Sequence, residues 1–430
     1  MRAIILTAGE GKRLRPITTS RPKPMIPLIG KPLLEHTIIG LKEAGINHII
    51  LIVGYKEETI RYHFDKFSKE FNLEIEYITQ KEFLGTAHAV AQVKNSMREE
   101  PFLILNGDIF VDAEILKELV QEYKKNPSEG YITLFEVENP ENFGVISLNS
   151  NGFVEKITEK PSSKLKLGNL ANAGIYIFNP LIFKAIEKTE KSIRNEYEIT
   201  DSMEILIEEF GVKIKGYIIK DYYWNDIGLP WQLFEVNHHI LDKLESKNLG
   251  IVEENVTITG NVYIGKDSII KSGSYIQGPC YIGNKCLIGP NAFIRPYTSI
   301  NDNCHIGMSE IKNSIIFSNS AIPHFNYIGD SIICEDVNLG AGTKISNLRF
   351  DNQNVTMNIN GSLIDSGLRK LGAIIGPNSQ TGINASIMCG KIIGNNSVIG
   401  AHTIVNENIP PNTLYYQESG GKNVKKPNPF

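Results

Sequence analysis

Cysteine is absent from the first 279 residues of this 430-residue sequence, and the five that follow form no C-x-x-C pair. An odd number without such a pair argues against a disulfide framework and against a structural zinc site. We therefore expect the cysteines to be small buried side chains within a repeat. They are Cys280, Cys286, Cys304, Cys334 and Cys389.

Long apolar runs and an excess of one charge are also lacking. The N-terminal stretch MRAIILTAGEGKRLRP has a four-residue apolar run, too short for a signal peptide or a membrane-spanning helix. The 44 basic and 48 acidic residues leave a formal charge of −4, so the chain as a whole does not attract nucleic acid or acidic membranes. We expect a soluble, cytoplasmic protein.

The residues that are present divide the chain into two parts. A length of 430 residues exceeds one ordinary core, and residues 1–230 alternate short apolar runs with helical spacing. This order predicts an α/β, Rossmann-like domain with a parallel sheet, helices on both faces and ligands at the carboxyl ends of the strands. Strands are expected at 3–7, 48–53, 73–78 and 102–106, with YITLFEV and NAGIYIFN extending the sheet, and helices at 33–45, 59–67 and 85–97.

The second part has a period of six. From Val252 to Ile306 an aliphatic residue returns at every sixth position, and after a slip near Lys312 the period resumes at Ile316. Six-residue repeats are typical of a β-helix, in which the aliphatic residues stack in the interior. We predict a left-handed parallel β-helix over 250–415.

Three segments lie outside these two patterns. Residues 231–249 are expected to form a linker helix, and the polar residues 416–430 a flexible tail. The segment Arg349–Leu371 breaks the repeat, and an excursion of that length is expected to project as a functional loop.

The loop LTAGEGKRLRP follows the first predicted strand. Its glycines allow backbone N–H groups to approach a phosphate or a base, while Lys12, Arg13 and Arg15 supply positive charge. A dinucleotide fingerprint would have a third small residue where Leu14 stands, so a triphosphate suits the loop better. A tight turn without a ligand is the alternative.

Two carboxylates and a lysine complete this candidate site. Asp108 in LNGD and Asp226 in YYWNDIG each follow an apolar stretch, and together they could share one Mg²⁺. Prolines on both sides of Lys23 in RPKPM limit where its amine can lie. Taken singly, each aspartate is more typical of a helix cap or turn, and the lysine of a solvated surface.

Several motifs in residues 1–230 resemble, in order, the sugar-1-phosphate nucleotidylyltransferase family. They are LTAGEGKRLRP, RPKPM, Gln80 before LGTAHAV, LNGD, FGV, ITEKP, NAGIY and WNDIG. The family joins a sugar 1-phosphate to a nucleoside triphosphate and releases pyrophosphate. Asp226 resembles thymidylyltransferases as much as uridylyltransferases, which leaves UTP and dTTP both open.

The resemblance implies roles for individual residues. Arg13 would neutralise the leaving pyrophosphate, Lys23 would hold the attacking sugar phosphate, and Asp108 and Asp226 would ligate Mg²⁺. The nucleotide would contact Leu6, Ala8, Gly9, Gly11, Lys12, Gln80, Gly85 and Thr86. The sugar and its phosphate would contact Gly144, Glu159, Lys160 and Asn172.

The second half resembles the acetyltransferase half of bifunctional uridylyltransferase/acetyltransferases, and more closely the archaeal bifunctional sugar-1-phosphate nucleotidylyltransferase/acetyltransferases. The motifs are IRP, EIKNS, PHFNYIGD, DVNLGAGT, SNLRF and SGLRKLGA. The resemblance implies that His324 is the general base for acetyl transfer from acetyl-CoA. It implies substrate contacts from Arg295, Lys312, Tyr327, Asn338 and Asn347, and a CoA channel lined by Ala341 and Ala401.

These resemblances imply a bifunctional enzyme that makes UDP-N-acetylglucosamine, with CoA bound between coils of neighbouring subunits in a homotrimer or a multiple of it. One alternative is a monofunctional glucose-1-phosphate uridylyl- or thymidylyltransferase in which the β-helix is a structural or regulatory scaffold. Another, outside catalysis, is a regulator that binds sugar nucleotides. The charged residues of the first half exceed what binding requires, which disfavours the regulator.

Overall fold

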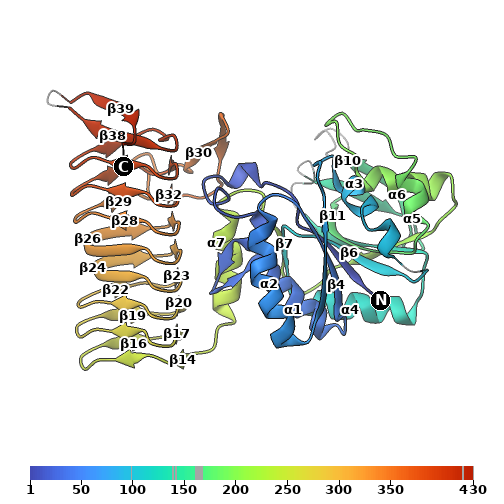
Figure 1. Cartoon of the computed structure of the whole chain (residues 1–430), viewed down its shortest axis with the longest axis horizontal. Coiled ribbons are helices and arrows are strands. Elements are labelled where there is room, and N and C mark those ends of the chain that lie inside the picture. Colours follow the sequence, from blue (N-terminus) through green and yellow to red (C-terminus); the bar gives the residue numbers. More distant parts are fainter. Residues whose placement is uncertain (98, 138–139, 141–142, 160–167, 419–420, 430) are drawn as a thin grey trace. The chain divides into compact units, whose positions relative to one another are not determined.

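The computed structural model describes residues 1–97, 99–137, 140, 143–159, 168–418 and 421–429 (Figure 1). The chain divides into two compact units. The first unit consists of Met1–Glu10, Arg21–Met25 and Pro32–Ile227. The second consists of Gly11–Ser20, Ile26–Lys31 and Gly228–Phe430, so two short N-terminal segments group with the C-terminal half. In the described part of the chain, no helix is long and apolar enough to cross a membrane.

The first unit is built on a nine-stranded sheet. Its parallel part runs in the order β6 (Phe102–Asn106), β1 (Ala3–Leu6), β4 (His48–Val53) and β5 (Glu74–Thr79), which are the four predicted strands. Strand β11 (Leu170–Phe178) pairs antiparallel with β6, so the sheet is mixed. The remaining strands are β8 (Gly130–Glu136), β9 (Gly144–Leu148), β10 (Val154–Glu159) and β12 (Ile214–Ile218).

Helices cover both faces of this sheet, as predicted. Successive residues of a strand point to opposite faces, and Ile5 of β1 packs in one core cluster while Ile4 packs in another. The Ile5 cluster includes residues of α1 (Leu33–Glu43), α2 (Glu57–Phe71) and α4 (Ala113–Lys125). The Ile4 cluster includes residues of α3 (Thr86–Ala91), α5 (Ile182–Ile186) and α6 (Ile199–Glu208).

Strands of the second unit stack in parallel from coil to coil, as a β-helix requires (Figure 1). Ile251 pairs with Ile269, and Ile269 with Leu287, so one coil takes 18 residues, or three six-residue repeats. One face consists of β14 (Lys247–Asn248), β17 (Val262–Ile264), β20 (Cys280–Ile282), β23 (Thr298–Ile300), β25 (Ile315–Ile316), β27 (Ile332–Ile333), β32 (Ala373–Ile375) and β35 (Lys391–Ile393).

The other two faces share a second sheet. One contains β15 (Ile251–Val252), β18 (Ile269–Ile270), β21 (Leu287–Ile288), β24 (His305–Lys312), β26 (Ala321–Gly329), β28 (Asn338–Leu339), β33 (Gln380–Thr381), β36 (Val398–Ile399) and β38 (Thr413–Gln417). The other contains β16 (Thr257–Thr259), β19 (Tyr275–Gln277), β22 (Phe293–Ile294), β29 (Lys344–Ile345), β34 (Ser386–Ile387) and β37 (Ile404–Val405), which join it through β24 and β26.

The periodic aliphatic residues form the interior of the coils. Ile276, Ile294, Ile311 and Ile328 belong to one core cluster and are fully buried. Four of the five cysteines are buried in the second unit, Cys389 is half-buried, and all five are free thiols. The prediction of small buried cysteines thus holds for four of them.

The predicted slip near Lys312 is a shortening of the coils. His305 pairs with Ala321, and Glu310 with Tyr327, so neighbouring coils are offset by 16 and then 17 residues instead of 18. The register shifts between Met308 and Glu310, a β-bulge that bends the strand and changes where its side chains point. Strands β24 and β26 are long because they continue from one face of the coil to the next.

Helix α7 (Gln232–Asp242) occupies part of the predicted linker, which is shorter than expected because β14 begins at Lys247. The helix packs on the coils of its own unit. Asn237, fully buried, donates a hydrogen bond to the carbonyl oxygen of Tyr297 at 3.1 Å. The rings of His238 and Tyr297 lie 4.2 Å apart.

Two other segments differ from the expectations. The excursion Arg349–Leu371, expected as a projecting loop, contains an antiparallel hairpin that was not predicted, β30 (Thr356–Ile359) with β31 (Ser362–Asp365). The expectation of a flexible tail over 416–430 is wrong for its described residues, because β39 (Asn423–Pro427) pairs antiparallel with β38. The pairing satisfies backbone groups that would otherwise stay open at the last coil.

Candidate active sites

The first candidate site lies where β1 and β6 end. Gly107, directly after β6, donates its backbone N–H to the carbonyl oxygen of Leu6, and a Cβ at Gly107 would lie 2.4 Å from that oxygen. A side chain at this position would therefore separate the two strand ends. Asp108 follows Gly107 directly, so the close approach of the two strand ends fixes the backbone position of Asp108.

Asp108 and Asp226 are brought together by two short antiparallel strands, β7 (Ile109–Val111) and β13 (Trp224–Asp226). Asp226 pairs with Ile109, the residue after Asp108. Lys23 lies between the carboxylates, with its Nζ 2.8 Å from Oδ2 of Asp108 and 3.7 Å from Oδ1 of Asp226. Three charged groups that are far apart in the sequence thus form one cluster.

The two carboxylates fit a magnesium ion. Their side chains are 43% and 40% exposed, whereas that of Lys23 is 8% exposed. Mg²⁺ in proteins is held by one or two carboxylates, with water and substrate phosphates completing its octahedron. No group of three or more His, Cys, Asp or Glu side chains that could hold a metal occurs among the described residues, so Asp108 and Asp226 are the carboxylate ligands that this site offers.

Other residues predicted to contact the nucleotide lie between Gln80 and Thr86 and at the end of β1. Gln80, buried, places its Nε2 2.9 Å from Nδ1 of His88. Gly85 has a φ of 107°, and a Cβ there would lie 2.5 Å from the carbonyl oxygen of Tyr197. Thr86 accepts the backbone N–H of Ile199 at 2.9 Å, so its hydroxyl has a structural partner. Leu6, Ala8 and Gly9 lie at and just after the end of β1, and a Cβ on Gly9 would meet nothing within 4 Å.

The expected sugar contacts lie on the neighbouring strands. Gly144 begins β9 and pairs with Glu159 of β10. Asn172 of β11 accepts the backbone N–H of Gly174 at 2.9 Å and donates to the Tyr176 hydroxyl at 2.8 Å. The side chain of Glu159 and the whole of Lys160 lie outside the described residues.

Gly11, Lys12 and Arg13 belong to the segment that groups with the second unit. Gly11 has a φ of 63° and precedes a 3₁₀ turn, Lys12–Leu14. The Arg13 guanidinium lies beside Gly228, since a Cβ at Gly228 would be 3.6 Å from both of its terminal nitrogens.

The second candidate site lies on β24 and β26, at the β-bulge. Ile322 and Ile328 of β26 are fully buried, whereas His324 between them is exposed and pairs with Met308. Phe325, next in the chain, has a left-handed φ of 54° and is 64% exposed. His324 thus points outward beside the bulge, while the isoleucines stay in the interior.

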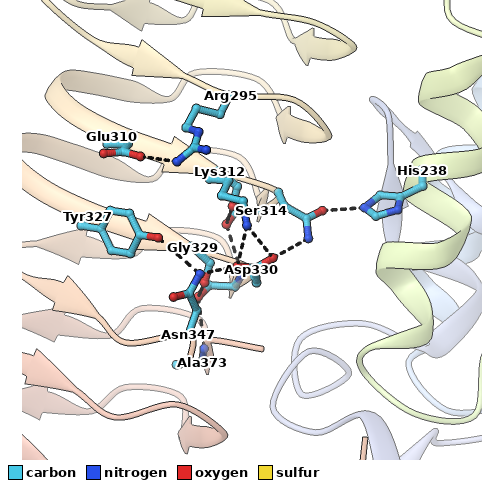
Figure 2. Close-up of polar contacts among 12 residues, drawn as sticks. His238, Arg295, Glu310, Lys312, Ser314, Tyr327, Gly329, Asp330, Asn347 and Ala373 are labelled. Atoms are coloured by element: carbon cyan, nitrogen blue, oxygen red, sulfur yellow. Dashed lines mark hydrogen bonds and ion pairs between the residues drawn. The ribbon is translucent and has the colours of Figure 1, made fainter. Parts of the chain in front are cut away.

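A buried aspartate gathers several of the predicted substrate-binding residues (Figure 2). The Lys312 Nζ lies 3.4 and 3.3 Å from the two carboxylate oxygens of Asp330. Asn347 donates a short hydrogen bond to Asp330 and a second one, at 3.3 Å, to the hydroxyl of Tyr327. Burial raises the pKa of the Tyr327 phenol, so this hydroxyl stays protonated at neutral pH.

Arg295 lies in the same region and is held by an acidic partner. Its Nη1 donates to Oε1 of Glu310 at 2.7 Å, and both side chains are about one-third exposed, at 36% and 34%. In Figure 2 this pair and the Asp330 cluster lie on adjacent coils of the same unit.

The remaining predicted residues lie further along the coils. Asn338 is exposed and pairs with Ala321, on the coil that follows β26. Ala341, Ile383 and Ala401 occupy equivalent positions of three successive coils, since Leu339 pairs with Thr381 and Thr381 with Ile399. Ile383 is 51% exposed, so this column of three residues includes a solvent-exposed apolar side chain.

Sequence reasoning missed Glu310, Asp330, Asn313 and His238, which bond to the predicted residues or to one another. Glu310 and Asp330 stand inside the quoted motifs EIKNS and PHFNYIGD, and their charge was an available signal. His238 had none, because its partner Asn313 is 75 residues away in the sequence.

Comparisons with known proteins match both halves of the chain. The family described as nucleotidyl transferase matches residues 2–243, and the family described as GMPPB C-terminal domain matches 276–367. Bifunctional protein GlmU of Methanococcus maripaludis is 47% identical over 432 residues, covering 100% of both chains. The bifunctional sugar-1-phosphate nucleotidylyltransferase/acetyltransferase of Sulfurisphaera tokodaii is 43% identical, covering 95% of this chain and 98% of that protein.

A solved structure adds to the comparison for the first half. A UDP-glucose pyrophosphorylase complexed with UDP-glucose is similar with a TM-score of 0.51 and 25% identity, over 56% of this chain and 98% of that one. The α/β, Rossmann-like domain and the left-handed β-helix that follows it are thus confirmed, as is an enzyme with a nucleotidylyltransferase and an acetyltransferase half. The chain belongs to the family of bifunctional sugar-1-phosphate nucleotidylyltransferase/acetyltransferases.

Proposed function

We propose that this enzyme makes UDP-N-acetylglucosamine in two steps at separate sites. The site at His324 acetylates glucosamine 1-phosphate with acetyl-CoA, and the site at Lys23, Asp108 and Asp226 transfers a uridylyl group from UTP to the product. The observation that carries the proposal is the exposed His324, one coil from the cationic and amide side chains held by Asp330. A β-helix that served only as a scaffold would not need this cluster.

In the acetylation step, His324 acts as general base. The amine nitrogen of the sugar attacks the thioester carbonyl carbon, the carbon–sulfur bond breaks, and CoA leaves as a thiol after taking up a proton. Imidazole suits this transfer because its ordinary pKa lies near neutral pH. Lys312 and Arg295 bind the sugar phosphate, while Tyr327, Asn338 and Asn347 orient the sugar and the acetyl group.

In the uridylylation step, the protein chiefly aligns phosphates and balances charge. A phosphate oxygen of the sugar attacks the α-phosphorus of UTP, and pyrophosphate leaves. Lys23, 2.8 Å from Asp108, holds the attacking phosphate, and Arg13 neutralises the leaving group. No general base is needed, because the attacking oxygen is already anionic.

Asp108 and Asp226 are proposed to hold Mg²⁺, and the first loop to hold the nucleotide. The ion, when bound, supplies positive charge that draws the phosphates of UTP together. The solved relative in complex with UDP-glucose supports a uridine nucleotide over a thymidine nucleotide. The nucleotide contacts are proposed at Leu6, Ala8, Gly9, Gly11, Lys12, Gln80, Gly85 and Thr86, and the sugar contacts at Gly144, Glu159, Lys160 and Asn172.

Acetyl-CoA is proposed to lie along the column of Ala341, Ile383 and Ala401. The exposed part of Ile383 and the small side chains beside it leave room for an apolar contact without blocking the column. The proposed assembly is a homotrimer in which CoA lies between the coils of neighbouring subunits. We propose that the enzyme works in the cytoplasm, where these small-molecule substrates are made.

Two product assays on purified protein test the proposal. CoA release is measured with acetyl-CoA and either glucosamine or galactosamine 1-phosphate, and pyrophosphate release with UTP or dTTP and several sugar 1-phosphates. We expect CoA release with glucosamine 1-phosphate, and the fastest pyrophosphate release with UTP and N-acetylglucosamine 1-phosphate. If no amino-sugar phosphate releases CoA, the monofunctional alternative with a structural β-helix is correct.

Variants separate the two activities. His324→Ala is expected to lower acetyl transfer by about 10² to 10⁴ while uridylyl transfer stays near wild type, because it removes the proposed base. Asp108→Ala should do the reverse. His305→Ala, on the preceding coil, is the matched control and should retain acetyl transfer. Equal loss of both activities in either variant would contradict two separate sites.

A further inference from the structure

Asp330 is a buried carboxylate with three donors around it. Its side chain is 4% exposed, against 21% for Lys312. Besides Lys312 and Asn347, Asn313 donates to Oδ1 of Asp330 at 2.7 Å. A carboxylate offers about four acceptor positions, and these contacts occupy both oxygens (Figure 2). The carboxylate is therefore fully used in holding other side chains, which excludes direct contact with a substrate phosphate.

The backbone of Asp330 is fixed on both sides. Its N–H donates to the carbonyl oxygen of Lys312 at 2.9 Å, and its carbonyl oxygen accepts from Gly372 at 2.7 Å. Its φ of 50° is left-handed, a conformation that aspartate and asparagine tolerate better than most residues. The position of the carboxylate is thus set by three successive coils, independently of its side-chain partners.

Space around Asn347 is shaped for the same contacts. A Cβ at Gly329 would lie 2.6 Å from the Asn347 Nδ2 and 2.8 Å from the Tyr327 hydroxyl. Glycine at this position therefore allows the amide and the phenol to meet. Because the amide nitrogen faces Asp330 and Tyr327, its carbonyl oxygen faces away from Asp330. That orientation leaves an acceptor for a substrate N–H or O–H.

The same network reaches helix α7. Nε2 of His238 lies 2.5 Å from Oδ1 of Asn313, whose Nδ2 donates to Asp330. The directions agree: the imidazole donates to the amide oxygen, and the amide nitrogen donates to the carboxylate. His238 also packs its ring on Tyr297, so the helix end of this series of hydrogen bonds is fixed on the coils.

We propose that Asp330 is a positioning residue of the acetyltransferase site, which orients Lys312 and Asn347 toward the amino-sugar phosphate, and that His238 holds Asp330 in place through Asn313. The inference deepens the proposed function and depends on it for the roles of Lys312 and Asn347. It also gives α7 a part in acetyl transfer, although the helix carries none of the proposed substrate contacts.

Two effects of Asp330 on phosphate binding oppose each other. Its negative charge repels a phosphate, while its hydrogen bonds hold Lys312 and Asn347 in place. In Asp330→Asn, the new amide nitrogen would face donors, so Lys312 or Asn347 must move. Misplacement by about 1 Å can cost about 10² in rate, which exceeds the gain from removing a charge that Lys312 already balances. We therefore expect the loss of positioning to decide the result.

Steady-state kinetics of acetyl transfer on the full chain test the proposal. Asp330→Asn is expected to raise the KM for glucosamine 1-phosphate by about tenfold or more, with the KM for acetyl-CoA and uridylyl transfer unchanged. His238→Phe, which keeps the ring on Tyr297 but removes the donor, should raise the same KM less. Asp302→Asn is the matched control, since Asp302 accepts three hydrogen bonds from Asn284 of the preceding coil, away from the cluster. It should change neither KM.

A double-mutant cycle tests whether Asp330 acts through Lys312. In the variant Lys312→Met with Asp330→Asn, the loss of glucosamine 1-phosphate binding should be smaller than the sum of the two single losses, as isothermal titration calorimetry would show, because only the part that acts through Asn347 is added. Fully additive losses, a lower KM in Asp330→Asn, or equal losses in Asp302→Asn would overturn the positioning role. Wild-type protein that neither binds the sugar phosphate nor releases CoA would instead contradict the proposed function itself.

Discussion

At the residue scale, the chemistry of the second unit depends on where charge is exposed and where it is buried. His324 is exposed at the bulge, and His305 lies on the preceding strand β24. Burial, then repulsion from His324 and Lys271, lowers the pKa of the His305 imidazole. His305 is therefore neutral at neutral pH. Its contribution to the stability of the fold is fully present above the pKa that His305 has in the unfolded chain. That contribution is lost as the pH falls through the pKa of His305 in the folded protein.

The repulsion between His305 and His324 can be tested by replacing His324. His324→Gln removes one positive group near His305, so the pKa of His305 should rise, although only in part because burial remains. Histidine titrations by NMR would measure this change. His402→Gln, a substitution on a later coil, should leave the His305 titration unchanged. A His305 pKa that falls in His324→Gln would show that the two imidazoles do not repel each other.

At the element scale, the coils are held by their interior stack and the site is made by a local departure from it. Ile294, Ile311 and Ile328 pair in sequence from coil to coil and are fully buried. Between these isoleucines, neighbouring coils are one or two residues shorter than 18, and β26 has a bulge where it pairs with β24. The bulge lies between His324, which is exposed, and Tyr327, which is half-buried.

Truncating one isoleucine of the stack should destabilise the second unit. Ile294→Ala is expected to lower its free energy of unfolding by about 2 to 5 kcal/mol, since it removes buried methyl groups and leaves a cavity. Differential scanning calorimetry and hydrogen exchange of the coils would measure the loss. Ile404→Ala is the matched control, because Ile404 is 47% exposed, and it should change stability by about 0.5 kcal/mol or less. Equal losses in both would contradict the interior stack as the source of stability.

At the scale of the whole molecule, the two chemistries are carried by different sets of residues. The carboxylates proposed to hold Mg²⁺ belong to the first unit, and the Asp330 cluster belongs to the second. Acetyl transfer needs a base and a bound phosphate, whereas nucleotidyl transfer must balance the charge of a triphosphate. The two activities should therefore respond differently to a change that affects metal alone.

Removing divalent metal should separate the activities. With excess EDTA, uridylyl transfer is expected to fall below detection, because Lys23 alone would have to balance two carboxylates and a triphosphate. Acetyl transfer should stay within about twofold of its untreated rate, because Lys312 and Arg295 are covalently part of the site. Both rates are measured on one sample, and added Mg²⁺ should restore the first. Loss of acetyl transfer under EDTA would contradict the separation.

The division into two halves can be predicted from the sequence, because the pattern of each half is local. Buried strands such as His48–Val53 are apolar throughout, and the six-residue period records the interior of each coil. The sequence also determined the individual motif residues, among them Lys23, Asp108 and His324, since each stands in a short segment of characteristic composition.

Which of these residues lie close together depends on the folded chain. The pairing of β7 with β13 brings Asp226 beside Asp108, and no pattern within either segment specifies it. Stacked coils likewise place Asn347 on Asp330 across 17 residues, and α7 places His238 on Asn313 across 75. Hydrogen bonds between coils and from helix to coil depend on distances in space, which local spacing does not contain. For that reason His324 was found in a motif, whereas the network that supports its site became visible only in the folded chain.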